Sequence, residues 1–255
     1  QRNTTSRYLV FMERPMVTSL APSRHLGVNV RYAHNWIWAS AGVFGPELKD
    51  SEAMGFMQDY NKDYGMSEGL SYTGKVVFRP LYKSKDASLH IGGAVSYRKP
   101  KTTLFKIKDF EELIEEDETI IAAIEEGKFS ELDVIGTAMD ARNSTDINRK
   151  KYVNTGDQLV GVDHEIAWTV ELAGHWKGLR YEAAYIAKTA HMNPAVNEVV
   201  YGDEGFKTFT GNGWYAQASY MLFGGTQAYD SDGAKYTRTT SGKKWGDLAL
   251  AAPFQ

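Results

Sequence analysis

The feature that most constrains the fold of this chain is a series of short segments in which apolar and polar side chains alternate. In the clearest segment, Tyr72, Val76 and Phe78 fall on one side while Lys75 and Arg79 fall on the other. Successive side chains of a β-strand point to opposite faces, so this segment has one apolar and one charged face. Because the polar faces repeatedly carry Arg and Lys, the pattern favours a wall between lipid and water.

Nine strands of this kind are predicted, near residues 7–12, 24–33, 36–44, 70–80, 88–98, 164–176, 179–188, 213–223 and 246–252. Short and long connections alternate along most of the chain, which is typical of an outer-membrane barrel. The connection 224–245 is long where a short turn is due, so either 234–240 forms another strand or the strand count is off by one. The predicted fold class is all-β, an antiparallel transmembrane β-barrel forming one domain over residues 1–255.

Charge is distributed unevenly along the chain. Residues 109–133 hold eleven acidic residues and one Lys, and the rest of the chain has 28 basic against 21 acidic residues. Within the acidic segment, apolar residues recur at helical spacing, which predicts an amphipathic helix near 109–127 on a long loop insertion, 99–163. The residues of this apolar pattern are Phe110, Leu113, Ile114, Ile121 and Ile124.

Motifs for catalysis, cofactors or metals are weak or absent in the sequence. GLSYTGKV resembles a phosphate-binding loop, but Val76 replaces the required Ser or Thr and the segment alternates as a strand. The segment 230–233 resembles the start of a calcium loop without its final Glu, so a turn is the simpler interpretation. Glu165 and Glu171 share one strand face, which ordinary polarity of a water-facing wall explains better than a catalytic pair. With no cysteine and scattered histidines, we predict no catalytic, cofactor or metal site.

The remaining signal is cationic. On a soluble sheet, Lys and Arg on a solvated outer face would carry no functional meaning. On the wall of a channel, they would concentrate anions and exclude cations, and this is the interpretation we favour. The strand-face cations are Arg31, Lys75, Arg79, Arg98, Arg180 and Lys188.

Four segments of the chain resemble the phosphate-selective porin O and P family of Gram-negative outer membranes. The most specific is YLVFMERPMVTSLAPSRHLGV, which contains Phe11, Met12, Glu13, Arg14, Ala21, Pro22, Arg24, Leu26, Gly27 and Val28. The others are YTGKVVFRP (72–80), GWYAQASYMLFGG (213–225) and KWGDLALAA (244–252).

The resemblance implies a sixteen-stranded barrel in the outer membrane, a homotrimer, and passage of small anions such as phosphate, with outer-membrane lipid around it and no nucleic acid. It adds Arg14 and Arg24, which lie in the matching motif, to the candidate anion pathway. Nine or ten strands are too few for that barrel, so we expect the chain to be a partial one. An acidic helix on a long loop is not part of the resemblance.

Two other functions compete with an anion channel. A porin for sugars or other organic solutes would use polar-face aromatics such as Trp38 and Tyr215 as a stacking path. A soluble β-sandwich that binds carbohydrate would also alternate, but it would hide its apolar faces in a core.

Overall fold

The computed structural model describes residues 11, 14–22, 25–47, 70–84, 86–99, 118–128, 140–142, 151–154, 159, 161–230, 232–244 and 247–254. Its elements in chain order are η2 (Met16–Leu20), β1 (His25–His34), β2 (Ile37–Glu47), β3 (Ser71–Phe78), β4 (Ala87–Arg98), α3 (Glu118–Glu125), β5 (Asp140–Arg142), β6 (Lys151–Asn154), β7 (Val162–Trp176), β8 (Leu179–Met192), α5 (Pro194–Tyr201), η3 (Gly202–Glu204), β9 (Thr208–Met221), β10 (Thr226–Asp230), β11 (Lys235–Thr240) and β12 (Ala249–Phe254). Among these residues, no helix is long and apolar enough to cross a bilayer.

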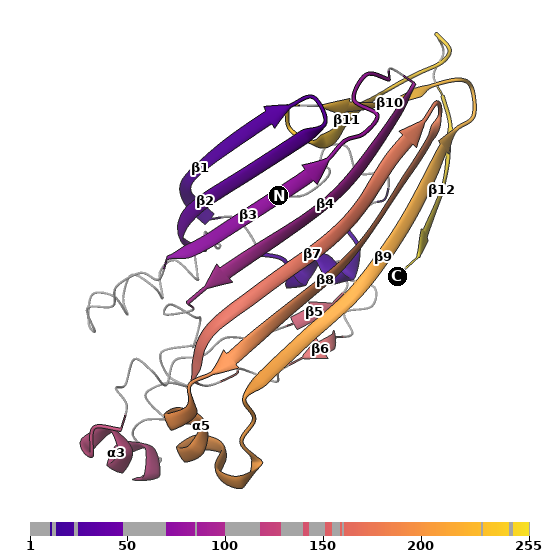
Figure 1. Cartoon of the computed structure of the whole chain (residues 1–255). Helices are drawn as coiled ribbons and strands as arrows, with labels where there is room; N and C mark the ends of the chain where they lie inside the picture. Colours follow the sequence, from indigo (N-terminus) through magenta and orange to yellow (C-terminus); the bar gives the residue numbers. More distant parts are fainter. Residues whose placement is uncertain are drawn as a thin grey trace.

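One large antiparallel sheet dominates the molecule (Figure 1). Its eight strands follow the order β1-β2-β3-β4-β7-β8-β9-β12, and every neighbouring pair is antiparallel. Eight of the nine predicted strands are confirmed here, and the one predicted near 7–12 lies outside the described residues except for Phe11. Within the described part of the chain β1 and β12 are free edges, so the sheet is open and closure into a barrel stays a prediction.

The two faces of the sheet are the reverse of those of a soluble protein. The apolar face is exposed, with Val28 at 75%, Val170 at 53% and Leu250 at 65% of full exposure. The opposite face, here called the polar face, carries buried charged and polar side chains, among them Lys75 at 5% and Arg180 at 2%. Exposure of this large apolar surface to water would be unfavourable, whereas the hydrocarbon of a bilayer would solvate it.

The two ends of the sheet differ in their connections (Figure 1). At one end, short turns join β1 to β2, β3 to β4 and β7 to β8; we call this the short-turn end. At the other end lie the long connections, including the helices α3 and α5, which pack against each other. The predicted alternation of short and long connections is therefore confirmed for these strands.

The β10–β11 hairpin explains why 224–245 broke that alternation. The possible strand at 234–240 exists as β11, and it pairs with β10 in a separate two-stranded sheet. This hairpin is inserted into a short-turn connection, and the chain returns to the main sheet in β12, which pairs with β9. The extra length of this connection therefore belongs to a hairpin beside the main sheet.

The helices only partly match the prediction. The described part of the acidic helix is α3, and residues 109–117 lie outside the described residues. Within α3, Ile120 and Ala123 are buried, and Ile121 and Ile124 of the predicted apolar pattern are half-buried. Helix α5 was not predicted, although the Asn193 side chain accepts a bond from the Ala195 N–H and caps a helix that begins with proline.

Candidate functional site

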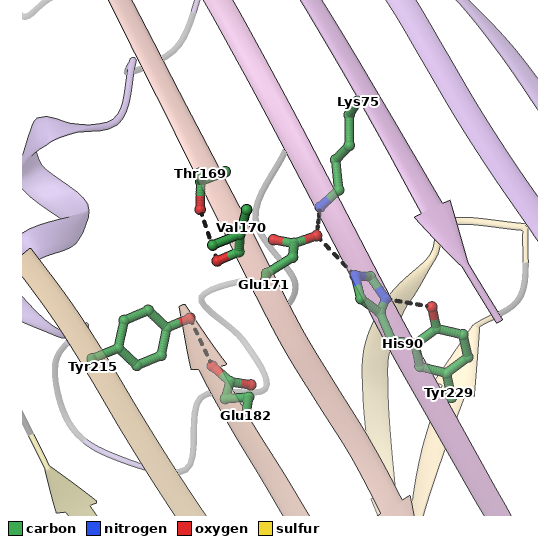
Figure 2. Close-up of polar contacts among 8 residues, drawn as sticks. All are labelled: Lys75, His90, Thr169, Val170, Glu171, Glu182, Tyr215 and Tyr229. Atoms are coloured by element: carbon green, nitrogen blue, oxygen red, sulfur yellow. Dashed lines mark hydrogen bonds and ion pairs between the residues drawn. The ribbon is translucent and has the colours of Figure 1, made fainter. Parts of the chain in front are cut away.

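A chain of four polar side chains crosses the polar face from the sheet to the hairpin (Figure 2). The ammonium of Lys75 on β3 forms an ion pair with Glu171 Oε1 on β7. The same oxygen lies 2.8 Å from Nε2 of His90 on β4, whose Nδ1 lies 2.7 Å from the hydroxyl of Tyr229 on β10. If Nε2 donates its proton to Glu171, neutral His90 accepts the Tyr229 hydroxyl proton at Nδ1, and every member of the chain is satisfied.

Small residues on β4 allow this chain to form. By the strand register, Ala94 lies beside Lys75 and Gly92 lies beside Glu171 on the same face. A Cβ atom at Gly92 would lie 2.7 Å from Glu171 Oε1 and 3.1 Å from His90 Nε2. The absence of a side chain at Gly92 therefore lets Lys75 and Glu171 meet above the strand between them.

A second group of polar side chains links β8 and β9 to the hairpin. Arg180 and Glu182, both on β8, form an ion pair of 2.8 Å, and the Tyr215 hydroxyl donates to Glu182 Oε1 at 3.3 Å. The guanidinium carbon of Arg180 also lies 4.3 Å from the ring centroid of Tyr236 on β11, within the range of a cation–π contact. Both polar groups on the wall therefore end at a tyrosine of the β10–β11 hairpin.

Two other predicted cations have local partners. Lys188 Nζ lies 2.8 Å from Glu165 Oε1. The Arg79 guanidinium donates from NH2 to the backbone carbonyls of His34 at 2.8 Å and Ile37 at 3.3 Å. Arg79 thereby caps the β1–β2 turn, which is a structural role that strand alternation alone did not reveal.

The predicted anion-pathway residues thus differ in their surroundings. Lys75, Arg180 and Lys188 each have a glutamate partner, which reduces the net charge that they present. Arg31 is exposed on the polar face, and Arg14 and Arg98 are half-exposed. Arg24 lies outside the described residues. Among those described, no group of three or more His, Asp or Glu side chains is suited to hold a metal ion.

The β10–β11 hairpin lies against the polar face at its short-turn end. The indole N–H of Trp38 donates to the Asp232 carbonyl at 2.9 Å, and Ala234 is buried together with Trp38 and Val77. Tyr236 is 1% exposed. Burial raises the pKa of the Tyr236 hydroxyl above its ordinary value, which keeps that hydroxyl protonated. The hairpin is therefore seated by aromatic and polar contacts with the wall.

The N-terminal segment covers another part of the same face. Val17 and Leu20 of η2 are buried against Ala184, Ile186 and Tyr215 of β8 and β9. The apolar surface that η2 covers lies on the otherwise polar side of the sheet. Two segments, η2 and the hairpin, therefore occupy space that a simple sheet would leave to water.

These contacts bear on the two competing functions. Trp38 is fully buried and Tyr215 is 7% exposed, so neither ring offers a stacking surface for a sugar. A soluble β-sandwich needs its apolar face covered, whereas Val28, Val170 and Trp176 are exposed here. The burial of Trp38 and Tyr215 therefore gives no support to a stacking path for sugars, and the exposed apolar face does not fit a soluble β-sandwich.

An antiparallel sheet with exposed apolar side chains on one face and ion pairs on the other is typical of the wall of an outer-membrane channel protein. The chain can therefore be assigned first to the class of porins. The family model for phosphate-selective porin O and P matches residues 118–254, more than half of the chain. The chain belongs to the phosphate-selective porin O and P family, which is a family of channels and not of enzymes. A comparison with curated proteins gives no match.

Sequence reasoning identified only part of this site. The match at 118–254 includes the similar stretches 213–225 and 244–252, whereas the stretch that contains Arg14 lies before it. Alternation placed Glu165 and Glu171 on the polar face, but it did not predict their cation partners. The role of His90 was missed, and the small residues Gly92 and Ala94 beside it were the available signal.

Proposed function

We propose that this sheet forms part of a closed, water-filled barrel in the outer membrane of a Gram-negative bacterium and conducts small anions, phosphate among them. The observation that carries the proposal is the reversed sheet, with exposed apolar side chains on one face and ion pairs on the other. Closure would pair the free edges of β1 and β12 through further strands, since a bilayer offers no water to unpaired backbone groups. A homotrimer is proposed on the family resemblance.

Anion preference is supported by the balance of charge on the polar face. In the described part of this face, Glu165, Glu171 and Glu182 each have a cationic partner, and the exposed Arg31 adds positive charge. Arg31 lies in the same row of the sheet as Lys75, with Ser40 between them. A positive wall raises the local concentration of anions, and guanidinium groups release them because binding to each is weak.

Planar-bilayer recordings under a salt gradient test this selectivity. We expect the reversal potential to favour chloride and phosphate over potassium, and the variant Arg31→Gln to shift it toward zero. The matched control is Lys177→Gln, which removes an exposed cation that lies over Trp176 at a short turn. A preference for potassium in the wild-type protein would reject anion selectivity while leaving the barrel intact.

A further inference from the structure

The two short segments that lead into and out of the β10–β11 hairpin, here called its roots, both bind one carboxylate, that of Asp247. Its Oδ1 accepts backbone N–H bonds from Phe223 at 2.8 Å and Leu248 at 2.9 Å. Its Oδ2 accepts from Gly225 at 2.8 Å and Gly242 at 3.1 Å. Phe223 and Gly225 precede β10 and Gly242 follows β11, so a single side chain joins the chain entering the hairpin to the chain leaving it.

The local sequence is suited to this convergence. A Cβ atom at Gly242 would collide with the carbonyl oxygen of Phe223, and one at Gly225 would collide with the Asp247 carboxylate. The two roots can therefore approach each other only because both positions are glycine.

The electrostatics of Asp247 agree with this geometry. Burial by itself would raise the pKa of the Asp247 carboxyl, but the four backbone N–H groups outweigh it and hold that pKa below its ordinary value. The surrounding backbone therefore stabilises the ionised carboxylate in particular, as expected for an acceptor of several N–H bonds.

The rest of the hairpin has limited means of holding its own position. Its strands pair with each other and not with the main sheet, and an isolated two-stranded hairpin is only marginally stable in water. Against the wall it has side-chain contacts of Tyr229 and Tyr236, the bond from Trp38 to the Asp232 carbonyl, and the packing of Ala234. The chain geometry at the two roots sets the direction in which the hairpin leaves the sheet, toward these contacts.

We propose that Asp247 is a positioning residue that keeps the β10–β11 hairpin seated on the polar face, and that the seated hairpin narrows the solute pathway at its short-turn end. This inference rests on the proposed function, because it requires the polar face to line a conducting pathway. Asparagine at position 247 would keep one acceptor oxygen but turn an NH2 donor toward backbone N–H donors. The roots would then separate, and the hairpin would leave the wall.

The experiment compares single-channel conductance in planar bilayers. Asp247→Asn is expected to raise the conductance severalfold or to add frequent openings to a larger level. The matched control is Asp232→Asn, which removes the same charge from the exposed tip of the hairpin and leaves its backbone carbonyl on Trp38 unchanged. This control is expected to conduct as the wild type does.

A deletion of residues 226–240, closed by a short glycine linker, separates positioning from a general structural effect. The deletion alone is expected to give the larger conductance, and adding Asp247→Asn to it should change nothing further. If the deletion leaves conductance unchanged, or if Asp247→Asn acts equally with and without the hairpin, the positioning role is wrong. A wild-type protein that forms no pores would instead contradict the proposed function.

Discussion

Replacing Val170 by arginine is expected to lower the free energy of unfolding from a lipid bilayer by about 2–4 kcal/mol, the cost of a cation on the lipid face near the membrane midplane. Val170 lies near the middle of β7, and its side chain is 53% exposed on the apolar face. In a soluble protein, a charge at such an exposed site would change stability by only about 0.5 kcal/mol. The measurement is a reversible urea titration of the protein folded into phospholipid vesicles.

The adjacent residue provides the control for this prediction. Thr169 is half-buried and points to the polar face of the same strand. Thr169→Arg changes the charge at nearly the same depth without placing it in hydrocarbon, so we expect a much smaller loss. Equal effects at positions 169 and 170 would contradict the assignment of the two faces, and with it the membrane-spanning sheet.

Removing the charge of Glu171 is expected to cost about 3–5 kcal/mol, because the variant Glu171→Gln takes a carboxylate away from the buried ammonium of Lys75. Glu171 is 8% exposed and Lys75 is 5% exposed, so water gives little compensation to either. The loss would again be measured by urea titration in vesicles.

A double-mutant cycle isolates the interaction of Glu171 with Lys75. Lys75→Met in the Glu171→Gln background removes the buried cation that has lost this carboxylate, so we expect it to recover a large part of the lost stability. Glu165→Gln serves as the comparison, because its partner Lys188 has a side chain that is 16% exposed and can turn toward water. Additive effects of the two substitutions at positions 75 and 171 would show that the observed ion pair contributes little.

The strands were predictable because their information is local. Each spanning strand must place apolar side chains toward one solvent and polar side chains toward another, so alternation marks the strand and its faces. The segment from Tyr72 to Phe78 shows this, since its even-numbered apolar side chains are exposed while Lys75 and Val77 are buried. The same reasoning fails for β10 and β11, because this hairpin has no lipid-facing side to impose an alternation.

The site was less predictable because it depends on register between distant strands. Lys75, His90 and Glu171 were each placed on the polar face by alternation, yet only the pairing of β3 with β4 and of β4 with β7 brings them together. Alternation assigned no partner to Lys75 or Arg180. Only the register of β3, β4 and β7 brings Lys75 to Glu171, whereas Glu182, the partner of Arg180, lies two residues along the same strand. A single strand contains no information on its neighbour across the sheet.

The amino-acid sequence by itself determined that this protein is a β-sheet with one face for lipid and one for water, since side-chain direction follows from chain position alone. The tertiary structure decided which charges neutralise each other and where the β10–β11 hairpin rests. Those outcomes depend on contacts between residues far apart in the chain, such as Glu171 with Lys75 and Asp247 with Phe223. They form only after the strands have taken their register.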